Sequence, residues 1–460
     1  MPHRLTLARM IGAIRSRELS PVELVEAHLR QIETHNPKVN AFITVLGEQA
    51  IAAARNGAVD GPLRGIPVTI KDSFDMEGLP ATCGSRLLTH RRTSRDATAV
   101  ARLRAAGAIP IGKTNCPEFL SNYESDNYIA GRTNNPWDFD RTPGGSSGGE
   151  AAAISAFFSA GGIGSDGGGS IRVPAHFCGI AGLKPTPGRV SGFGHVPEMA
   201  HPSGLLGVAG PIARTAEDVR ILFEVLAGYD AQDPFSAPVP LRTPDLTGIR
   251  VGCMPRFYDV PVQAAVARAV EAASACLRDL GFPVEAFEPK GLERAPNLWW
   301  ILFGVLPARF TGDSIAGRED QVHWTGMEFL KPALAEPEPS GKKVMETLAV
   351  RDKMRASLLR EMERFPVILA PVSGTTSFRH RERRYATPEK EISQFEAMMP
   401  ATLFNLLGMP AVTIPLGMDE NGLPVGVQLA GRPYDEELLL ELAVRMEQAR
   451  GPFPAPPGFA

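Results

Sequence analysis

Two glycine-rich segments carry the serines that could take part in chemistry. The first, residues 142–149, holds Ser146, and the second, residues 161–170, ends at Ser170. The apolar stretch between them, residues 150–160, predicts a buried helix. Because glycine inside regular structure costs roughly 0.5–1 kcal/mol relative to alanine, this density indicates backbone that is bent into special conformations or lies close to a ligand. Two ordinary flexible loops are the alternative, but such loops are usually polar and charged.

Three short patterns associated with ligands or catalysis also match, and each lacks the context that it needs. Residues 107–114 fit the phosphate-loop pattern GxxxxGK[ST], but their apolar interior predicts a strand and Pro110 has no N–H for a phosphate. Residues 162–167 fit the dinucleotide pattern GxGxxG, without an acidic residue about twenty positions on. Residues 145–149 fit the nucleophile elbow GxSxG around Ser147, but a polar loop precedes them where a strand is required.

Helices and strands alternate along the chain, which is typical of an α/β protein. Ser20 and Glu23 form a capping-box pattern, with Pro21 at the first helical position. Further helices are expected at residues 266–280, 345–365 and 436–449. Strands are expected at residues 108–111, 249–253, 367–370, 411–415 and 425–429.

In order and spacing, several segments of the chain resemble the amidase signature family. These segments are residues 65–72, 96–119, 134–149, 164–174, 182–186, 210–214 and 422–428. The match is good over residues 17–230 and 400–445. The resemblance implies an α/β fold with a large mixed central sheet covered by helices on both faces. It also implies one domain over residues 1–460, with a variable substrate-determining region at residues 286–345.

The resemblance implies a role for each catalytic residue. Ser170 would attack an amide carbonyl and become the acyl-enzyme, Ser146, preceded by a cis peptide, would bridge the proton, and Lys71 would be the base. Lys71 must be neutral to accept a proton, although a lysine ordinarily titrates near ~10.4. Residues 68–70 indicate a buried strand end, where desolvation lowers the pKa of a lysine.

The same resemblance implies an oxyanion site built from backbone. The N–H groups that would converge there belong to Gly167, Gly168, Gly169 and Ser170. Many family members carry threonine or isoleucine in place of Gly167, so this glycine is expected to loosen the loop slightly without removing a donor. Asp166 and Arg172 are expected to brace the loop as an ion pair.

The expected function is hydrolysis of a carboxylic amide to an acid and an amine or ammonia. The alternative is the amide-hydrolysing subunit of a glutamine-dependent amidotransferase complex, although residues 115–118 resemble the stand-alone amidases more. A catalytically silent binding protein is a third reading, and the three intact catalytic positions argue against it. Residues 286–345, which match nothing in the resemblance, are expected to set the substrate. Their apolar cluster, residues 299–303, is expected to be core in preference to pocket wall.

Composition bounds the partners and the location. The chain has 48 Lys and Arg against 51 Asp and Glu, so its net charge of −3 gives no reason to expect nucleic acid or an anionic membrane. The five scattered cysteines favour free thiols, and residues 151–165, the longest uncharged stretch, are too short to span a bilayer. None of the nine histidines, which include His176, His195 and His201, is assigned a role, and no metal or organic cofactor is implied. We therefore expect a cytoplasmic protein with a small-molecule amide as its partner, no nucleic acid, no membrane, and a homodimer left open.

Overall fold

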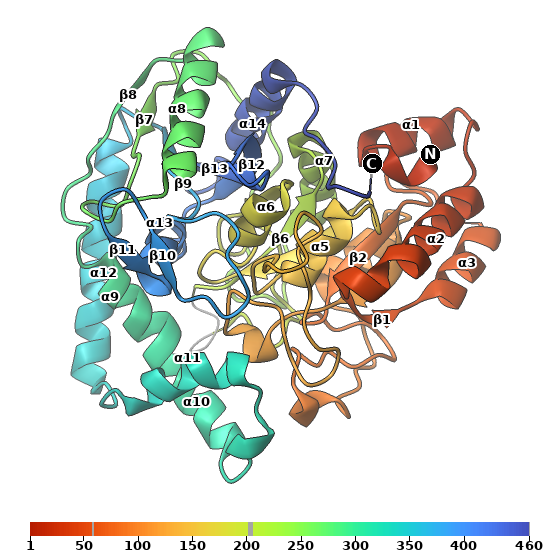
Figure 1. Cartoon of the computed structure of the whole chain (residues 1–460), viewed down its shortest axis with the longest axis horizontal. Coiled ribbons are helices and arrows are strands. Elements are labelled where there is room, and N and C mark those ends of the chain that lie inside the picture. The colour runs from red at the N-terminus through yellow and green to blue at the C-terminus, as the bar shows by residue number, and fades with distance from the viewer. Residues whose placement is uncertain (58, 201–205, 460) are drawn as a thin grey trace.

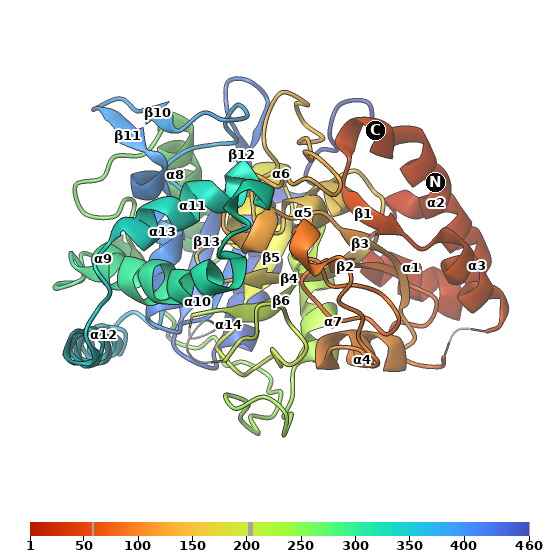
Figure 2. The same cartoon turned by 90° about the horizontal axis from the view of Figure 1, so that it is seen from below.

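An 11-stranded mixed sheet runs through the centre of the chain (Figures 1 and 2). The computed structural model describes residues 1–57, 59–200 and 206–459. The strand order across the sheet is β1-β3-β2-β4-β6-β5-β12-β13-β9-β7-β8. The strands are β1 (Phe42–Val45), β2 (Pro67–Lys71), β3 (Ile109–Thr114), β4 (Gly161–Asp166), β5 (Ala181–Lys184), β6 (Val208–Ala213), β7 (Val251–Cys253), β8 (Val284–Ala286), β9 (Val367–Pro371), β12 (Ala411–Met418) and β13 (Pro424–Gly431). A separate hairpin is formed by β10 (Arg384–Ala386) and β11 (Glu391–Ser393).

Helices cover both faces of this sheet, which confirms the expected fold class. Strand β9 shows how one strand serves both faces, because its side chains alternate. Val367 and Leu369 belong to the apolar cluster that includes helices α7 (Ala216–Leu226), α8 (Ala264–Asp279) and α14 (Glu436–Arg450). Ile368 and Ala370 belong to the cluster that includes α9 (Ala295–Trp299), α12 (Gly341–Glu361) and α13 (Gln394–Leu406). The other helices are α1 (Leu7–Arg15), α2 (Pro21–Val39), α3 (Gly47–Arg55), α4 (Thr98–Ala105), α5 (Gly148–Ser155), α6 (Arg172–Cys178), the π-helical η4 (Trp300–Val305), α10 (Leu306–Ile315) and α11 (Trp324–Ala335).

Local signals in the sequence account for several of these elements. The capping box at the start of α2 is present: Glu23 N–H donates to Ser20 Oγ at 3.2 Å and Ser20 N–H donates to Glu23 Oε2 at 2.8 Å. Every residue of α5 is buried, as its apolar sequence predicts. No helix in the described ranges combines the length and the apolar character that a bilayer crossing needs.

Helix α5 lies against the strands because one glycine leaves room for it. A Cβ atom on Gly162, in β4, would lie 2.0 Å from Glu150 Oε1 of α5 and 2.2 Å from the carbonyl oxygen of Thr69 in β2. No side chain fits there. The glycine density of this region therefore serves close packing, and residues 162–167 form a strand end in place of a dinucleotide loop.

The phosphate-loop pattern at residues 107–114 belongs to a buried strand, as its apolar interior predicts. Lys113 is in β3, and its Nζ lies 2.7 Å from Asp72 Oδ1, with both side chains only 1% exposed. Lys113 Nζ also donates to the carbonyl oxygen of Pro80 at 2.5 Å. This lysine therefore binds the segment that follows β2 and faces no phosphate site.

We expect Lys113→Met to destabilise the fold, because it leaves the Asp72 carboxylate buried without its cation. Breaking such a buried pair from one side typically costs about 3–5 kcal/mol of the free energy of unfolding, and urea denaturation measures it. The double variant Lys113→Met/Asp72→Asn should recover part of that loss. The matched surface control, Lys331→Met at an exposed position of α11, should change stability by no more than about 0.5 kcal/mol. A loss for Lys113→Met as small as that of the control would contradict this reading.

Candidate active site

Two parallel strands bring a lysine and a serine to the same edge of the sheet. Strand β2 ends at Lys71, and β4, its parallel neighbour, contains Ser165. Lys71 is fully buried, and its Nζ donates to Ser146 Oγ at 2.7 Å and to Ser165 Oγ at 3.0 Å. The peptide between Gly145 and Ser146 is cis, as the resemblance implies. Sequence reasoning missed Ser165, although its place just before Asp166 on a strand beside β2 could have indicated it.

Burial governs the charge of Lys71. It lowers the pKa of the Lys71 amine to about 8, while the nearby groups Cys116, Cys83, Asp166 and Glu150 act in the opposite direction. Within the described residues no carboxylate forms an ion pair with this amine, since Ser146 and Ser165 are its hydrogen-bond partners. Near neutral to mildly alkaline pH the amine can therefore lose its proton.

The loop after β4 is built around the carboxylate of Asp166. The Gly169 N–H donates to Asp166 Oδ1 at 2.7 Å and the Ile171 N–H donates to Oδ2 at 3.1 Å. Arg172 Nε lies 3.0 Å from Oδ2, with both side chains fully buried, which confirms the expected ion pair. The remaining Arg172 donors reach Gln428 Oε1 at 2.7 Å and Asn405 Oδ1 at 2.6 Å. The Arg172 guanidinium holds the pKa of Asp166 well below its usual range, although burial alone would raise it.

The amides of this loop divide into free and engaged donors. Within the described ranges, the N–H groups of Gly167, Gly168 and Ser170 donate no hydrogen bond to another residue. Gly169 differs, because its N–H is already bound by Asp166. The expectation that Gly169 contributes a free donor is therefore corrected, and the reason is the local turn that Asp166 closes.

The hydroxyl of Ser170 lies in the same loop. Ser170 is 9% exposed, and its Oγ forms no hydrogen bond with any residue in the described part of the chain. The expected bridge from Ser146 to Ser170 is therefore not closed in this conformation. Hydrogen bonds of this kind are often long in unliganded sites and shorten in complexes.

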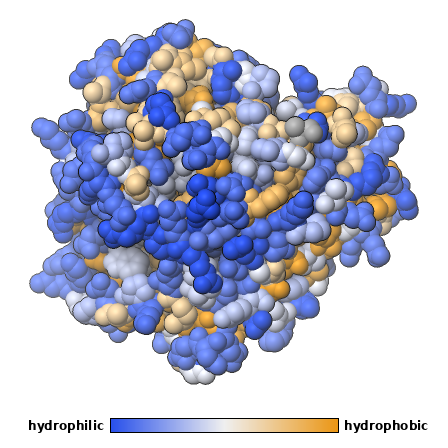
Figure 3. Space-filling model, viewed as in Figure 1, coloured by the Kyte–Doolittle hydropathy of each residue, from blue (hydrophilic) through white to orange (hydrophobic). Residues whose placement is uncertain are grey.

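A cavity of about 320 Å³ opens beside Ser146 and Ser165, and Ser170 is not among the described residues that line it. Gly167 lines it, and its polar lining residues are Ser121, Ser146, Ser165, Asp166, His195, Glu198, Thr311 and Ser314. Its apolar walls are formed by Leu88, Phe119, Leu120, Phe303, Pro307, Phe310, Phe329 and Leu330. None of the described residues that line it is a lysine or an arginine. The outer face drawn in Figure 3 is largely hydrophilic, with smaller hydrophobic patches.

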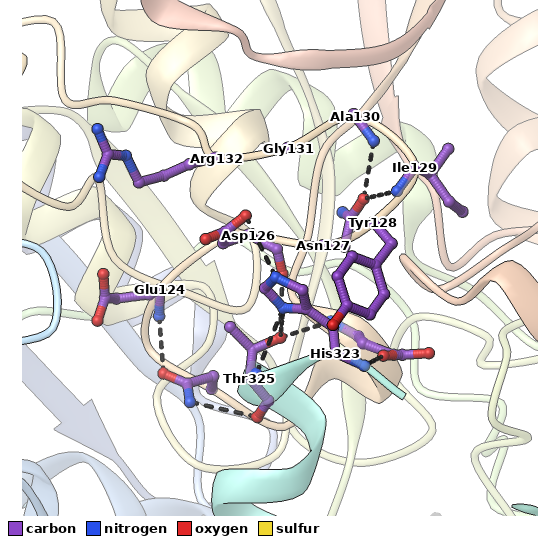
Figure 4. Close-up of polar contacts among 12 residues, drawn as sticks. Glu124, Asp126, Asn127, Tyr128, Ile129, Ala130, Gly131, Arg132, His323 and Thr325 are labelled. Atoms are coloured by element: carbon purple, nitrogen blue, oxygen red, sulfur yellow. Dashed lines mark hydrogen bonds and ion pairs between the residues drawn. The ribbon is translucent and has the colours of Figure 1, made fainter. Parts of the chain in front are cut away.

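One wall of the cavity is anchored to the segment that follows β3 (Figure 4). At the start of α11, Thr325 Oγ1 donates to the carbonyl oxygen of Asp126 at 3.0 Å. The His323 ring packs edge-on against Tyr128, with ring centroids 4.6 Å apart. Asn122 Nδ2 also donates to the Thr325 carbonyl oxygen at 3.3 Å. These contacts hold α11, which carries Phe329 and Leu330, over the cavity.

The apolar cluster at residues 299–303 contributes both to the core and to the wall of the cavity. Trp299 is 4% exposed and belongs to a core cluster, as expected. Phe303 lines the cavity. A Cβ atom on Gly167 would lie 2.2 Å from Phe303 Cε2, so the phenyl ring occupies the space of a side chain at that position. A ring therefore packs where the side chain is missing, and we expect it to limit the loosening predicted for Gly167.

Two histidines weighed in the sequence contact backbone groups, and one of them, His195, also lines the cavity. His176 Nδ1 accepts the Gly426 N–H at 2.7 Å, and burial lowers the pKa of His176 to about 4. His195 Nδ1 lies 2.7 Å from the Pro197 carbonyl oxygen, and burial lowers the pKa of His195 to about 3. His201 lies outside the described residues. No group of His, Cys, Asp and Glu within the described ranges is arranged to hold a metal ion.

Comparisons with known proteins identify the family of the chain. A family model described as Amidase matches residues 23–440. A glutamyl-tRNA(Gln) amidotransferase subunit from Chloroflexus aurantiacus is 36% identical, over 96% of this chain and 95% of that protein. The corresponding subunit from Methylococcus capsulatus is 36% identical over 97% of each chain. Among solved structures, 6-aminohexanoate cyclic dimer hydrolase complexed with substrate has a TM-score of 0.88, 30% identity and 98% coverage of both chains. The glutamyl-tRNA(Gln) amidotransferase subunit from Thermotoga maritima has a TM-score of 0.81 and 29% identity, over 99% of this chain and 98% of that chain.

The names of these relatives correct the expectation about partners. The expectation that a small-molecule amide is the partner of a chain acting alone or as a homodimer, with no nucleic acid, is contradicted by relatives named as subunits of an enzyme for glutamyl-tRNA(Gln). The physical reason is that a net charge of −3 averages over the whole chain and says nothing about a surface that binds another protein chain. The resemblance of residues 115–118 to stand-alone amidases was too short a signal to decide this.

The contact between Gly167 and Phe303 predicts a coupled pair of substitutions. Gly167→Thr should cost about 1–3 kcal/mol of the free energy of unfolding, because it overpacks the space that the ring fills. Adding Phe303→Ala should remove the clash, so that the double-mutant cycle gives a coupling energy above about 0.5 kcal/mol. Gly417→Thr, where an added Cβ would meet nothing within 4 Å, is the matched control. Additive effects of Gly167→Thr and Phe303→Ala in urea denaturation would contradict the contact.

Proposed function

Because the chain belongs to the amidase signature family, we propose that it hydrolyses a carboxylic amide through an acyl-enzyme on Ser170. In this proposal Ser146 is the proton bridge and Lys71 is the base. The observation that carries it is the 2.7 Å hydrogen bond between Lys71 Nζ and Ser146 Oγ, made by a buried amine whose pKa is lowered to about 8.

The proposed reaction follows from these positions. Ser170 Oγ attacks the carbonyl carbon while its proton passes to Ser146 Oγ, and the Ser146 proton passes to the neutral Lys71 amine. The free N–H groups of Gly167, Gly168 and Ser170 stabilise the negative oxygen of the tetrahedral intermediate. The C–N bond then breaks as the proton returns along the same path to the leaving nitrogen. Water attacks the ester of Ser170 by the same proton path and releases the acid.

The relatives support a particular setting for this chemistry. The match to the glutamyl-tRNA(Gln) amidotransferase subunit of Chloroflexus aurantiacus runs over 96% of this chain and 95% of the relative. We infer that the chain is the amide-hydrolysing subunit of a glutamine-dependent amidotransferase complex. In that setting glutamine is the amide, and the ammonia released at Ser170 is used by the complex.

We expect the rate of amide hydrolysis to follow the titration of Lys71. A base acts only when it is deprotonated, so kcat/KM should rise with pH and level off above about pH 8, where burial places the pKa of Lys71. Lys71→Ala should lower kcat/KM by about 10²–10⁴-fold. Lys71→Arg should not restore activity, because arginine does not give up its proton. The measurement is kcat/KM against pH for an uncharged amide such as propionamide.

Single substitutions of His176 and His195 are the controls, since their pKa values of about 4 and 3 lie far below this limb of the profile. A limb near pH 8 that disappears with either histidine and survives Lys71→Ala would contradict the assignment of the base. A fluorophosphonate should label Ser170, and label found on Ser147 would favour a nucleophile elbow in its place.

Membership of a complex predicts that partner subunits raise the rate of glutamine hydrolysis more than the rate of hydrolysis of uncharged amides. The described cavity lining has no lysine or arginine for the α-carboxylate of glutamine, so the isolated chain should hydrolyse glutamine poorly. The chain purified with its natural partners should release ammonia from glutamine at least tenfold faster, while hydrolysis of propionamide should change little. Both rates are measured by ammonia release. Equal glutamine turnover by the isolated chain and by the assembly would contradict the assignment to a complex.

A further inference from the structure

The carbonyl groups of residues 166–169, here called the oxyanion loop, are all held from outside the cavity. Asn405 Nδ2 donates to the carbonyl oxygen of Asp166 at 3.0 Å. Trp299 Nε1 donates to that of Gly167 at 3.0 Å, and the Tyr123 hydroxyl donates to that of Gly168 at 2.6 Å. The carbonyl of Gly169 accepts the N–H of Val173 at 2.7 Å.

The direction of each amide follows from these bonds. In a planar trans peptide the C=O and the next N–H point in opposite directions. The bond from Trp299 to the Gly167 carbonyl therefore aims the Gly168 N–H away from the indole. The bond from Tyr123 to the Gly168 carbonyl fixes the next peptide, whose N–H on Gly169 reaches Asp166 at 2.7 Å.

The loop needs this external support because of its composition. Residues 167–169 are consecutive glycines, which favour no single backbone conformation. The neighbouring rings supply the missing packing. A Cβ atom on Gly168 would lie 2.5 Å from Trp299 Cζ2, and the Trp299 and Phe303 rings stack with centroids 4.8 Å apart. The indole therefore fills the space beside the loop and bonds to it.

The two donors are suited to a fixed task. Trp299 is 4% exposed, and the indole N–H is a donor only. Burial raises the pKa of the Tyr123 phenol well above its usual range, so the hydroxyl keeps the proton that it donates. One of the two side chains precedes the loop in the sequence and the other follows it. Tyr123 follows β3, and Trp299 ends α9.

We propose that Trp299 and Tyr123 are positioning residues: Trp299 orients the free Gly168 amide toward the reacting carbonyl, and Tyr123 fixes the next peptide, which holds the loop between the free amides of Gly168 and Ser170. This inference rests on the proposed function of Gly167, Gly168 and Ser170 as oxyanion donors. It assigns a catalytic consequence to residues 286–345, because the region expected to set the substrate also supplies Trp299.

The test uses Trp299→Phe, which keeps a ring and removes the N–H, and Tyr123→Phe, which removes only the hydroxyl. Each should lower kcat for propionamide on the order of 10-fold, below the 10²–10³ typical of losing an oxyanion donor itself. KM should change less than about twofold and the pH midpoint should stay in place, since Lys71 is untouched. Binding of phenylboronic acid, whose serine adduct places an oxygen in the oxyanion site, should weaken by the same factor as kcat.

Trp300→Phe is the matched control, because the neighbouring indole contacts Phe329 and Phe395 and forms no hydrogen bond to the loop. It should leave kcat and boronate binding unchanged. Unchanged kcat in both Trp299→Phe and Tyr123→Phe would overturn the proposal, as would a loss of kcat without weaker boronate binding. If Trp299→Phe does not fold, Tyr123→Phe decides alone. A wild-type chain that hydrolyses no amide and takes no fluorophosphonate at Ser170 would instead overturn the proposed function.

Discussion

An amine buried without a carboxylate partner is the constraint around which this site is arranged. Lys71 and Lys113 lie at the ends of neighbouring parallel strands, and both side chains are almost completely buried. Lys113 has Asp72 at 2.7 Å, whereas the partners of Lys71 among the described residues are the hydroxyls of Ser146 and Ser165. Because burial without a counter-charge favours the neutral amine, the choice of partner decides whether a buried lysine is structural or basic. Ser146 places its hydroxyl 2.7 Å from this amine, whose pKa burial lowers to about 8.

The sequence predicted the parts of the fold that depend on local patterns. The apolar alternation of helices and strands, the capping box at Ser20 and the buried helix between the glycine segments all follow from neighbouring residues. The strand expected at residues 108–111 extends to Thr114 in the structure. The prediction ended where the apolar run ends, whereas the strand continues through Lys113 and Thr114. Ser165 escaped detection for a related reason: a serine among glycines looks like part of a loop, and only the pairing of β4 with β2 places it beside Lys71.

Contacts made across the fold could not be read from spacing. Trp299 reaches Gly167 and Asn405 reaches Asp166 from far along the chain, and no sequence pattern links those positions. The occupied amide of Gly169 is a different case. Its acceptor, Asp166, lies only three residues earlier, so local turn chemistry could have excluded this donor. The prediction of the partners was wrong for a third reason, since the average charge of the chain carries no information about one surface.

The two thiols beside Lys71 have a consequence for chemical selectivity. Burial raises the pKa of Cys116 to about 12 and that of Cys83, which lines the cavity, well above its usual range. Because the thiolate and not the thiol is the nucleophile, both sulfurs should react slowly with electrophiles despite their position. An electrophilic probe that enters this cavity should therefore discriminate sharply in favour of a hydroxyl. Reagents that modify cysteines would leave the cavity open, which makes serine-directed probes suitable for counting functional sites in a mixture.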